Sequence, residues 1–334
     1  MAEGEDILID NWGRRVNYLR IAITDRCNLR CFYCMPEEGI NYLPKKELLT
    51  YEELLRLAHI VAELGVNKIR LTGGEPFIRR DVMSFLDNLN QIPGIDSIHI
   101  TTNGVFTHKY LDDLQSVGIK SVNLSIDTLD PEKFKQITRR DEFHNVEKTL
   151  YGLLERNIPT KINMVVMEGQ NIDDIVPMVE LGKNEPLEVR FIEEMPFNGD
   201  ASHHVALTWN HKRVLQTIQN TYPETSSIAH DFNSTSLRYQ IEGFKGSFGI
   251  IPAYSRTFCG TCNRLRITSQ GTIKTCLYDD GVLDLKESLR NGSSDDLIKN
   301  QLKAVVGKRA KDGFEAEKAR KILTINESMS SIGG

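Results

Sequence analysis

The stretch VNYLRIAITDRCNLRCFYC, residues 16–34, decides the fold class of this chain. Its first half alternates between apolar residues and a second, more polar set formed by Arg20, Ala22 and Thr24. This alternation with a period of two predicts a β-strand, because successive side chains of a strand point to opposite faces. Directly after the predicted strand come three cysteines, Cys27, Cys31 and Cys34.

The same kind of strand recurs along the first 200 residues and alternates with helical patterns. The predicted strands are Val16–Thr24, Asn67–Thr72, Ser97–Thr101, Lys120–Ile126, Thr160–Val166 and Leu187–Ile192. A capping box of Thr50 and Glu53 predicts the start of the clearest helix, which ends at Gly65. Further amphipathic helices are expected at Asp81–Leu89, Lys109–Val117, Val146–Arg156 and Asp173–Leu181. Strands and helices in this order imply a parallel sheet with right-handed crossovers.

One face of these strands is polar and cationic, which distinguishes an open barrel from a closed one. A half-solvated antiparallel sheet would also alternate, but the intervening helices favour parallel strands covered on their outer side. A closed eight-stranded barrel fills its interior with bulky apolar residues. Here the inner positions include Arg20, Arg70, Asn123, Lys161 and Arg190. We therefore predict a partial, TIM-like (β/α)6 barrel whose interior holds a large anionic ligand.

The repeating pattern ends after Glu193, where Pro196, Asn198 and Gly199 interrupt it. We expect two parts: residues 1–200 form the partial barrel with the first cysteine group, and residues 201–334 form a C-terminal α+β extension with a second group. Within this extension we expect a helix from Thr208, a highly charged stretch at residues 307–320 and three further elements: strands at Ser236–Ile241 and Gly246–Ile251, and a helix at Ser294–Val305.

Composition limits the class of protein. The chain has 41 basic and 46 acidic residues, a formal net charge of −5, 40% hydrophobic and 26% charged residues, which is typical of a soluble globular protein. The mildly acidic balance argues against broad nucleic-acid binding, and no apolar run approaches the length of a membrane span. The opening residues Met1–Asp10 carry acidic but no basic side chains, unlike a targeting peptide. We expect a cytoplasmic enzyme.

The six cysteines form two groups of three, Cys27-x3-Cys31-x2-Cys34 and Cys259-x2-Cys262-x13-Cys276. This is not the density of a secreted disulfide scaffold, and the short spacings indicate metal ligation. Three ligands leave one coordination position free, as in a reactive site. For the first group, three irons of a cubane cluster are the favoured reading over zinc or unconnected thiols. For the second, a zinc ribbon lacking one ligand or a structural loop remains an alternative.

The first cysteine motif resembles that of the radical S-adenosylmethionine (SAM) superfamily, and so does Thr72-Gly73-Gly74-Glu75-Pro76 at the end of the second strand. A dinucleotide site of the Rossmann type is disfavoured, because no G-x-G-x-x-G opens a helix. The resemblance implies a [4Fe-4S] cluster whose free iron is chelated by SAM. It also implies SAM contacts at Tyr33, Gly74, Ser125 and Met195.

The run Cys259-Gly-Thr-Cys262-Asn-Arg264-Leu-Arg266, followed by Cys276 and a terminal Gly333-Gly334, closely resembles the GTP 3′,8-cyclase (MoaA) family of molybdenum cofactor biosynthesis. That resemblance implies a second [4Fe-4S] cluster on these cysteines, with the guanine of GTP reaching its free iron. It implies active-site roles for Arg264, Arg266 and the tail glycines Gly333 and Gly334. The implied GTP contacts are Arg20, Arg70, Thr101, Lys161, Arg264 and Arg266, with Lys68 and Arg190 as additions.

The resemblance also implies a reaction and partners. A 5′-deoxyadenosyl radical abstracts the ribose 3′ hydrogen of GTP, and the carbon radical attacks C8 of guanine to give (8S)-3′,8-cyclo-7,8-dihydroguanosine 5′-triphosphate. The implied partners are a reductant such as flavodoxin or ferredoxin, a downstream cyclic pyranopterin monophosphate synthase and a second copy of the chain in a homodimer.

Several alternatives remain open on the sequence. The chain could be a radical SAM enzyme that modifies a peptide and carries one auxiliary cluster, or a non-enzymatic zinc-binding protein. In isolation, Arg264 and Arg266 are also compatible with a solvated strand face, and Gly333-Gly334 with a disordered end or a conjugation tail.

Overall fold

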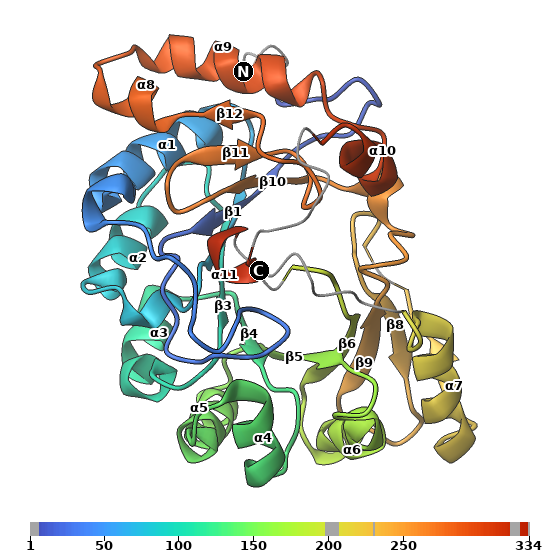
Figure 1. Ribbon diagram of the computed structural model, residues 1–334. Helices are drawn as coiled ribbons and strands as arrows, with labels where there is room; N and C mark the ends of the chain where they lie inside the picture. The colour runs from blue at the N-terminus through green and yellow to red at the C-terminus, as the bar shows by residue number, and fades with distance from the viewer. Residues whose placement is uncertain (1–6, 198–206, 230, 321–327, 333–334) are drawn as a thin grey trace.

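The computed structural model describes residues 7–197, 207–229, 231–320 and 328–332. Within these residues one sheet of twelve strands runs in the order β12-β11-β10-β1-β2-β3-β4-β5-β6-β9-β8-β7 and curves into an open arc (Figure 1). Its middle consists of six parallel strands in chain order, as predicted. They are β1 (Tyr18–Ala22), β2 (Lys68–Thr72), β3 (Ser97–Thr102), β4 (Ser121–Ser125), β5 (Thr160–Val166) and β6 (Glu188–Glu193).

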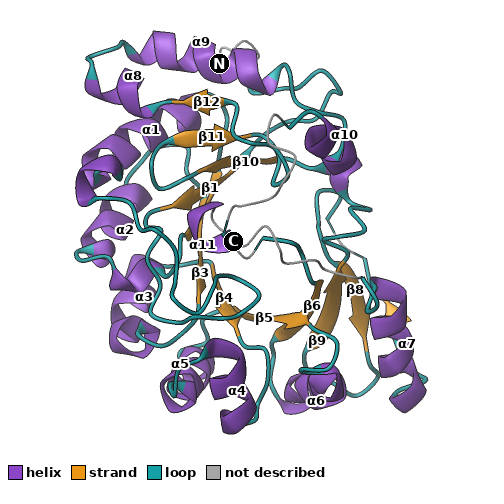
Figure 2. Cartoon of the chain, viewed as in Figure 1, coloured by secondary structure: helices purple, strands orange, loops and turns teal. Residues whose placement is uncertain are grey.

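Helices cover the outer side of the arc (Figure 2). They are α1 (Tyr51–Glu63), α2 (Val82–Asn90), α3 (Leu111–Val117), α4 (Pro131–Thr138), α5 (Phe143–Glu155) and α6 (Ile175–Asn184). The capping box predicted for α1 is present, since Thr50 Oγ1 accepts from the Glu53 amide and the Glu53 carboxylate accepts from the Thr50 amide. The partial (β/α)6 barrel is therefore confirmed.

The crossover between β4 and β5 differs from the expectation, because it contains two helices instead of one. The additional helix, α4, has Asp130 as its N-cap and Pro131 in its first turn, and it is followed by Arg139 as its C-cap, with a positive φ of 56°. In sequence, an Asp-Pro pair indicates a turn as readily as a helix start. A helix of eight residues shows too little periodicity to settle this choice.

The C-terminal third extends both edges of the same sheet. At one edge β10 (Arg264–Ile267) pairs in parallel with β1 and continues through β11 (Thr272–Lys274) and β12 (Leu283–Asp284). At the other, β9 (Ser247–Ile251) pairs in parallel with β6 and continues through β8 (Leu237–Gln240) and β7 (Ser226–Ser227). The remaining helices are α7 (His211–Thr221), α8 (Lys286–Arg290), α9 (Asp295–Val306), α10 (Gly313–Lys318) and α11 (Met329–Ile332).

Short 3-10 helices complete the described elements. They are η1 (Lys45–Glu47), η2 (Pro76–Ile78), η3 (Thr107–Tyr110), η4 (Ile172–Asp174) and η5 (Cys259–Thr261). The predicted α+β extension is present, but it is joined to the barrel by backbone pairing at both edges. The expected division at residue 200 falls on residues 198–206, which lie outside the described ranges.

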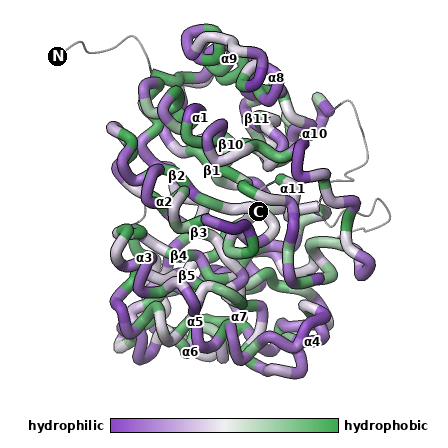
Figure 3. Tube along the Cα trace, turned by 90° about the vertical axis from the view of Figure 1, so that its left-hand side faces the viewer, coloured by the Kyte–Doolittle hydropathy of each residue, from purple (hydrophilic) through white to green (hydrophobic). Residues whose placement is uncertain are grey.

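The hydrophobic core lies between the sheet and its helices. Apolar residues of β1 and β2, such as Leu19 and Ile69, pack in one cluster with Leu54 and Leu57 of α1. A second cluster of buried apolar residues packs β4, β5, β6 and β9 against the helices that cover them. Along the helices hydrophobic and hydrophilic residues alternate, as Figure 3 shows, so their apolar faces are available for these clusters. The opposite face of the sheet is left for polar side chains.

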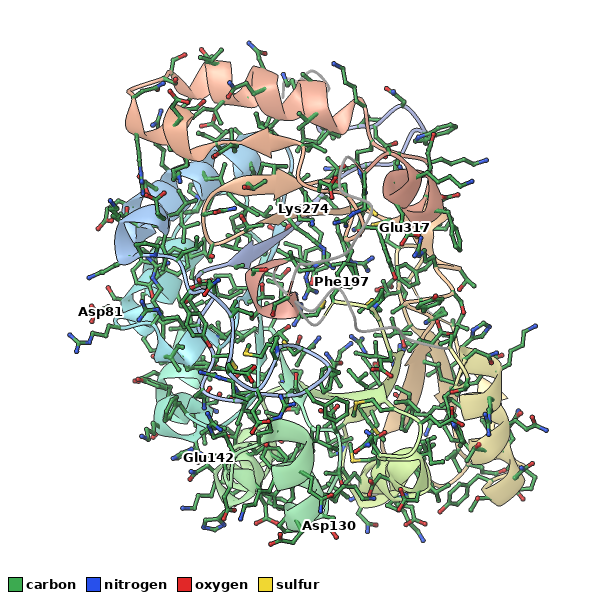
Figure 4. All side chains as sticks on the ribbon, viewed as in Figure 1. Asp81, Asp130, Glu142, Phe197, Lys274 and Glu317 are labelled. Atoms are coloured by element: carbon green, nitrogen blue, oxygen red, sulfur yellow. The ribbon has the colours of Figure 1, made fainter. Side chains whose placement is uncertain are left out.

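Labelled side chains illustrate this division. Phe197 and Lys274 lie within the arc, whereas Asp81, Asp130 and Glu142 lie at its periphery near the helices (Figure 4). No helix in the described part of the chain is long and apolar enough to cross a membrane.

Candidate functional site

Parallel register aligns basic residues on neighbouring strands. Arg266 of β10 lies opposite Arg20 of β1, Arg20 opposite Arg70 of β2, and Arg70 opposite His99 of β3. Lys274 of β11 lies opposite Arg266. Side chains at paired positions share a face of the sheet, so all five lie on one face. Arg266, Arg20 and Arg70, which also line the cavity described below, are called the basic row, and Lys274 and His99 continue it at either end. Burial and the nearby Arg266 lower the pKa of the Arg20 guanidinium, which shows how crowded with positive charge this row is.

A second polar row lies closer to the carboxyl ends of the strands. In this row Thr101 of β3 lies opposite Asn123 of β4, and Asn123 lies opposite Lys161 of β5. Two residues further along the strands, Ser125 of β4, Asn163 of β5 and Arg190 of β6 are aligned in the same way. The alternation in the sequence predicted this face. His99 follows the same alternation and was overlooked as a candidate because its strand also carries Ser97 and Thr101, which are uncharged.

These rows line a cavity of about 660 Å³ inside the arc. The cavity brings together all predicted site residues that the structure describes. They are Cys27, Cys31, Cys34, Cys259, Cys262 and Cys276, together with Tyr33, Gly74, Ser125, Met195, Arg20, Arg70, Thr101, Lys161, Arg264, Arg266, Lys68 and Arg190. Gly333 and Gly334 lie outside the described residues.

Arg70 is held rigidly in the basic row. Its Nε donates to the hydroxyl of Tyr18 at 2.6 Å, and its Nη1 donates to the Ile100 carbonyl at 2.9 Å. Burial opposes ionisation of Tyr18, but Arg70, Arg20 and Arg264 outweigh it and lower the pKa of Tyr18 to about 7. Sequence reasoning missed Tyr18, because an aromatic residue at a strand start is an ordinary core residue.

The carboxylate of Glu188 partly neutralises the positive charge on the β5–β6 side of the cavity. Its oxygens lie 3.4 Å from Lys161 Nζ, 2.5 Å from Arg190 Nε and 3.3 Å from Arg238 Nε. Three cations face one carboxylate, so the local charge stays positive. Burial, with Arg190 as the next cause, lowers the pKa of Lys161 to about 8. This half of the cavity is therefore also suited to an anion.

The glycine-rich loop after β2 is attached to the first cysteine loop. The Gly74 amide donates to the Thr24 carbonyl at 2.8 Å, and the Glu75 amide donates to the Arg26 carbonyl at 2.8 Å. A Cβ on Gly73 would stand 2.6 Å from the Thr24 carbonyl oxygen, and a Cβ on Gly74 would overlap the Arg26 carbonyl. Close approach of two backbones therefore requires glycine at both positions.

Glu75 ties the same loop to the end of β3. Its buried carboxylate accepts from the Asn103 amide at 2.7 Å, the Thr102 hydroxyl at 2.8 Å and the Phe77 amide at 3.1 Å. Asn103 in turn donates through Nδ2 to Cys27 Sγ at 3.6 Å. Burial raises the pKa of Glu75 to about 7. Asn103 was missed in the sequence, because a single Asn after a strand carries no distinguishing pattern.

Tyr33 belongs to the first cysteine loop, whereas Ser125 and Met195 lie elsewhere in the lining of the same cavity. Tyr33 donates to Asp127 at 2.8 Å, and Asp127 also accepts from the Val165 amide at 2.9 Å. Ser125 is the last residue of β4. Met195 packs against a small cluster around Phe197 and Tyr278, whose ring centroids are 5.2 Å apart.

The first cysteine group consists of free thiols in a buried setting. Burial is the main cause that raises the pKa of Cys27 to about 12 and of Cys34 to about 11, and it raises that of Cys31 as well. The C-terminal segment reaches this group, since Ser328 donates through Oγ to the Cys34 carbonyl at 2.7 Å. Buried thiols become thiolates when a metal supplies the compensating charge.

The second group has a different electrostatic setting. Burial disfavours the Cys262 thiolate, but Arg264 and Arg309 outweigh it and lower its pKa to about 7. Arg309 Nη2 lies 3.6 Å and Arg264 Nη1 lies 3.9 Å from Cys262 Sγ. By contrast, burial raises the pKa of Cys276 to about 12. Arg309 belongs to the charged stretch at residues 307–320, where the sequence could not single out one arginine.

Both groups offer the donor set of an iron–sulfur cluster. All six thiols are free, both groups of three line the same cavity, and a four-iron cluster takes one thiolate at each of three irons. A zinc ion instead gathers its ligands around one point. Among the described residues, no three Cys, His, Asp or Glu side chains converge on such a point.

The chain is similar to known proteins along most of its length. The family model of the radical SAM superfamily matches residues 21–182, and that of Molybdenum Cofactor Synthesis C matches residues 187–314. GTP 3′,8-cyclase of Syntrophomonas wolfei is 43% identical over 330 residues, covering 95% of this chain and 99% of that protein.

A further relative and a solved structure extend the comparison. Molybdenum cofactor biosynthesis protein 1 of Bos taurus is 44% identical over 303 residues, 90% of this chain and 48% of that protein. The chain thus spans about half the length of that and the similar mammalian relatives. Native anSMEcpe with bound AdoMet has a TM-score of 0.61 at 16% identity, covering 87% of this chain and 83% of that one, and shows the fold alone. By sequence and architecture, the chain belongs to the GTP 3′,8-cyclase family within the radical SAM superfamily.

Proposed function

We propose that this chain is a radical SAM cyclase that converts GTP to (8S)-3′,8-cyclo-7,8-dihydroguanosine 5′-triphosphate in molybdenum cofactor biosynthesis. One observation carries the proposal: both cysteine groups and the basic row open into one cavity of about 660 Å³. A radical generated at one end and a nucleotide bound at the other would meet within this space. The 43% identity to a GTP 3′,8-cyclase over almost its whole length supports the same substrate.

The basic row is proposed to bind the nucleotide. A triphosphate carries several negative charges, and Arg offers planar, multidentate donors that match phosphate oxygens. Arg20, Arg70 and Arg266 stand in register on adjacent strands and so present such donors side by side. Thr101, Lys161 and Arg190 would contribute from the β3–β6 side, with Lys68 as an additional cation. The fixed scaffold would align the ribose without reorganisation on binding.

Cys27, Cys31 and Cys34 are proposed to hold the first [4Fe-4S] cluster and to leave one iron for SAM. Gly74 would bring backbone close to the methionyl group, since its own environment admits no side chain. Tyr33, Ser125 and Met195 would contact the rest of SAM. When bound, this cluster and SAM supply one-electron chemistry that removes a hydrogen atom from a sugar carbon.

Cys259, Cys262 and Cys276 are proposed to hold the second [4Fe-4S] cluster beside the guanine base. Arg264 and Arg266 flank it on β10, one beside Cys262 and one in the basic row. Gly333 and Gly334 are proposed to reach the substrate from α11, whose Met329 and Ser330 line the cavity.

Several wider features are also proposals. A reductant such as flavodoxin or ferredoxin would supply the electron, and a cyclic pyranopterin monophosphate synthase would take the product. A homodimer is proposed as the assembly, and the cytoplasm as the compartment, which suits six free thiols. We further propose that residues 1–200 carry the radical-forming part and residues 201–334 the part around the second cluster.

Reconstitution under anaerobic conditions tests the function. The loaded chain, with SAM and a reductant, should form 5′-deoxyadenosine much faster with GTP than with ATP or without nucleotide. A peptide-modifying enzyme would instead show no preference for GTP, and this result would contradict GTP as the substrate. A colourless zinc-loaded chain would overturn the radical chemistry itself.

A further inference from the structure

A buried carboxylate joins two arginines from opposite ends of the chain beside the second cysteine group. Asp10 Oδ2 lies 2.6 Å from Arg14 Nε and 3.3 Å from Arg309 Nη1. The exposed fractions of these side chains are 0% for Asp10, 8% for Arg14 and 3% for Arg309. A buried ion-pair network is costly unless its charges are also hydrogen-bonded, so the other contacts of these arginines deserve an explanation.

Both guanidinium groups bind the backbone that carries the cysteines. Arg14 Nη1 donates to the Cys259 carbonyl at 2.9 Å. Arg309 donates from Nη1 to the Cys262 carbonyl at 3.1 Å, and from Nε to the carbonyl of Thr275, which precedes Cys276, at 3.2 Å. One unit of three side chains thus contacts the chain at or next to each cysteine of the group.

Arg309 also contacts a thiol directly, through the 3.6 Å approach of Nη2 to Cys262 Sγ. Together with Arg264, it gives Cys262 two guanidinium donors. Other cysteine sulfurs accept from uncharged donors: Cys27, for example, accepts from the Asn103 side-chain amide at 3.6 Å, and Cys276 accepts from the Tyr278 backbone amide at 3.5 Å. Positive charge is therefore directed at one thiol of the second group.

The carboxylate is itself fixed by local structure. Asp10 Oδ1 accepts from the Trp12 amide at 2.9 Å and from the Arg14 amide at 3.0 Å, which closes a turn. A backbone bond from the Leu8 amide to the Leu64 carbonyl at 3.1 Å anchors this turn to the end of α1. The Trp12 indole donates to the Arg309 carbonyl at 3.1 Å. The three charged groups are thus positioned by protein contacts alone.

We propose that Asp10, Arg14 and Arg309 form a preassembled clamp that holds the second cysteine group ready for its cluster, and that Arg309 raises the reduction potential of that cluster. This inference rests on the proposed function, which assigns the cluster to these cysteines. Hydrogen bonds and positive charge at a ligating sulfur stabilise the more negative, reduced state of a cluster. All three are positioning residues, because they act through the cysteine loops.

The test is a redox titration of the reconstituted full chain, followed by electron paramagnetic resonance. The signal of the second cluster is identified as the one that GTP perturbs, and that of the first as the one that SAM perturbs. In Arg309→Gln the second signal should shift to a lower midpoint potential, while the first stays unchanged. Arg309→Lys, which keeps the positive charge, should recover part of the shift.

A matched control is Arg56→Gln. Arg56 also binds a carboxylate and two carbonyls, those of Leu289 and Ser293, but none near a cysteine. The Arg56→Gln variant should leave the midpoint potentials of both clusters unchanged. If Arg309→Gln does not fold, Asp10→Asn keeps both arginines but removes the carboxylate that positions them, and it should slow the reconstitution of the second cluster while the first is rebuilt at the wild-type rate.

The outcomes separate this inference from the function on which it rests. About eight irons per chain with an unaltered second potential in Arg309→Gln would overturn the inference alone. Lower thermal stability of the metal-free variant, with wild-type iron content and potential, would assign the arginine a merely structural role and overturn the inference too. About four irons in the wild-type chain would instead overturn the second-cluster assignment and the redox role with it.

Discussion

Gly74 lies against the carbonyl group of Arg26 more closely than any residue with a Cβ could. The adjoining backbone bonds, from Gly74 to Thr24 at 2.8 Å and from Glu75 to Arg26 at 2.8 Å, fix the glycine-rich loop to the loop that carries the first cysteines. The two motifs that first indicated radical chemistry are therefore one structural unit.

Gly74→Ala should separate these two loops. A Cβ cannot be accommodated against a backbone carbonyl without a shift, and such overpacking costs about 1–3 kcal/mol. We expect 5′-deoxyadenosine formation to fall by at least roughly 100-fold, because a displacement of about 1 Å can cost that much in rate. Gly118→Ala is the control: its φ of +76° makes alanine strained, but no atom lies within 4 Å. That variant should lose stability and keep its activity.

Substitutions in the two cysteine groups should have separable effects. Cys31→Ala should abolish SAM cleavage and reduce the iron content from about eight to about four per chain. Cys262→Ala should lose the same amount of iron, yet retain slow SAM cleavage, because the first group is intact. Iron analysis and quantification of 5′-deoxyadenosine check both. SAM cleavage in Cys31→Ala at the wild-type rate would contradict the assignment of the first cluster.

Arg266→Ala should uncouple SAM cleavage from cyclisation. Arg266 stands beside Arg20 in the basic row, and loss of one charge-assisted hydrogen bond to a phosphate costs about 1.5–3 kcal/mol. We expect GTP affinity to fall roughly 10- to 100-fold. Binding is measured by isothermal titration with GTP, and cyclisation by product analysis. If Arg266→Ala cyclises GTP fully at the concentration that suffices for the wild type, Arg266 does not bind the substrate.

His99 should make folding sensitive to acid. Burial, followed by Arg70, Lys68, Lys161 and Arg190, lowers its pKa from 6.5 to about 3. Because the unfolded chain binds this proton more readily, stability should decrease as the pH falls from about 6.5 toward 3. After allowance for solvent screening, this effect lowers the free energy of unfolding by about 1 kcal/mol at pH 5 relative to pH 7.

The control for this prediction is His99→Gln, which keeps a polar partner for Ser121, now 2.7 Å from His99 Nδ1. Denaturant unfolding of the metal-free chain at pH 7 and pH 5 measures the difference. The variant should lose less stability than the wild type between these two values. Equal losses would mean that His99 does not titrate in this range.

The sequence predicted the local features of the fold well. Alternation in the six strands identified which residues face the interior, and register then placed Arg20 beside Arg70. The spacing of the cysteines identified their grouping. These features depend on neighbours within a few residues, where strand geometry and turn chemistry act directly.

Long-range pairing could not be predicted in the same way. Nothing in the residues of β9 and β10 indicates that they join opposite edges of one sheet, since pairing partners are chosen by tertiary packing. The contact between Asp10 and Arg309 spans 299 positions of the chain, and neither residue belongs to a motif. The sequence therefore indicated the chemistry of the second cysteine group and not the side chains that position it.

The most direct test of the central claim uses GTP with deuterium at the ribose 3′ carbon. The reconstituted chain is incubated anaerobically with this substrate, SAM and a reductant, and the 5′-deoxyadenosine is analysed by mass spectrometry. If the basic row and the two cysteine groups bring GTP and SAM together as proposed, deuterium will be found in 5′-deoxyadenosine, and cyclised nucleotide will accumulate with it. Abundant 5′-deoxyadenosine without deuterium, and GTP recovered unchanged, would contradict the account.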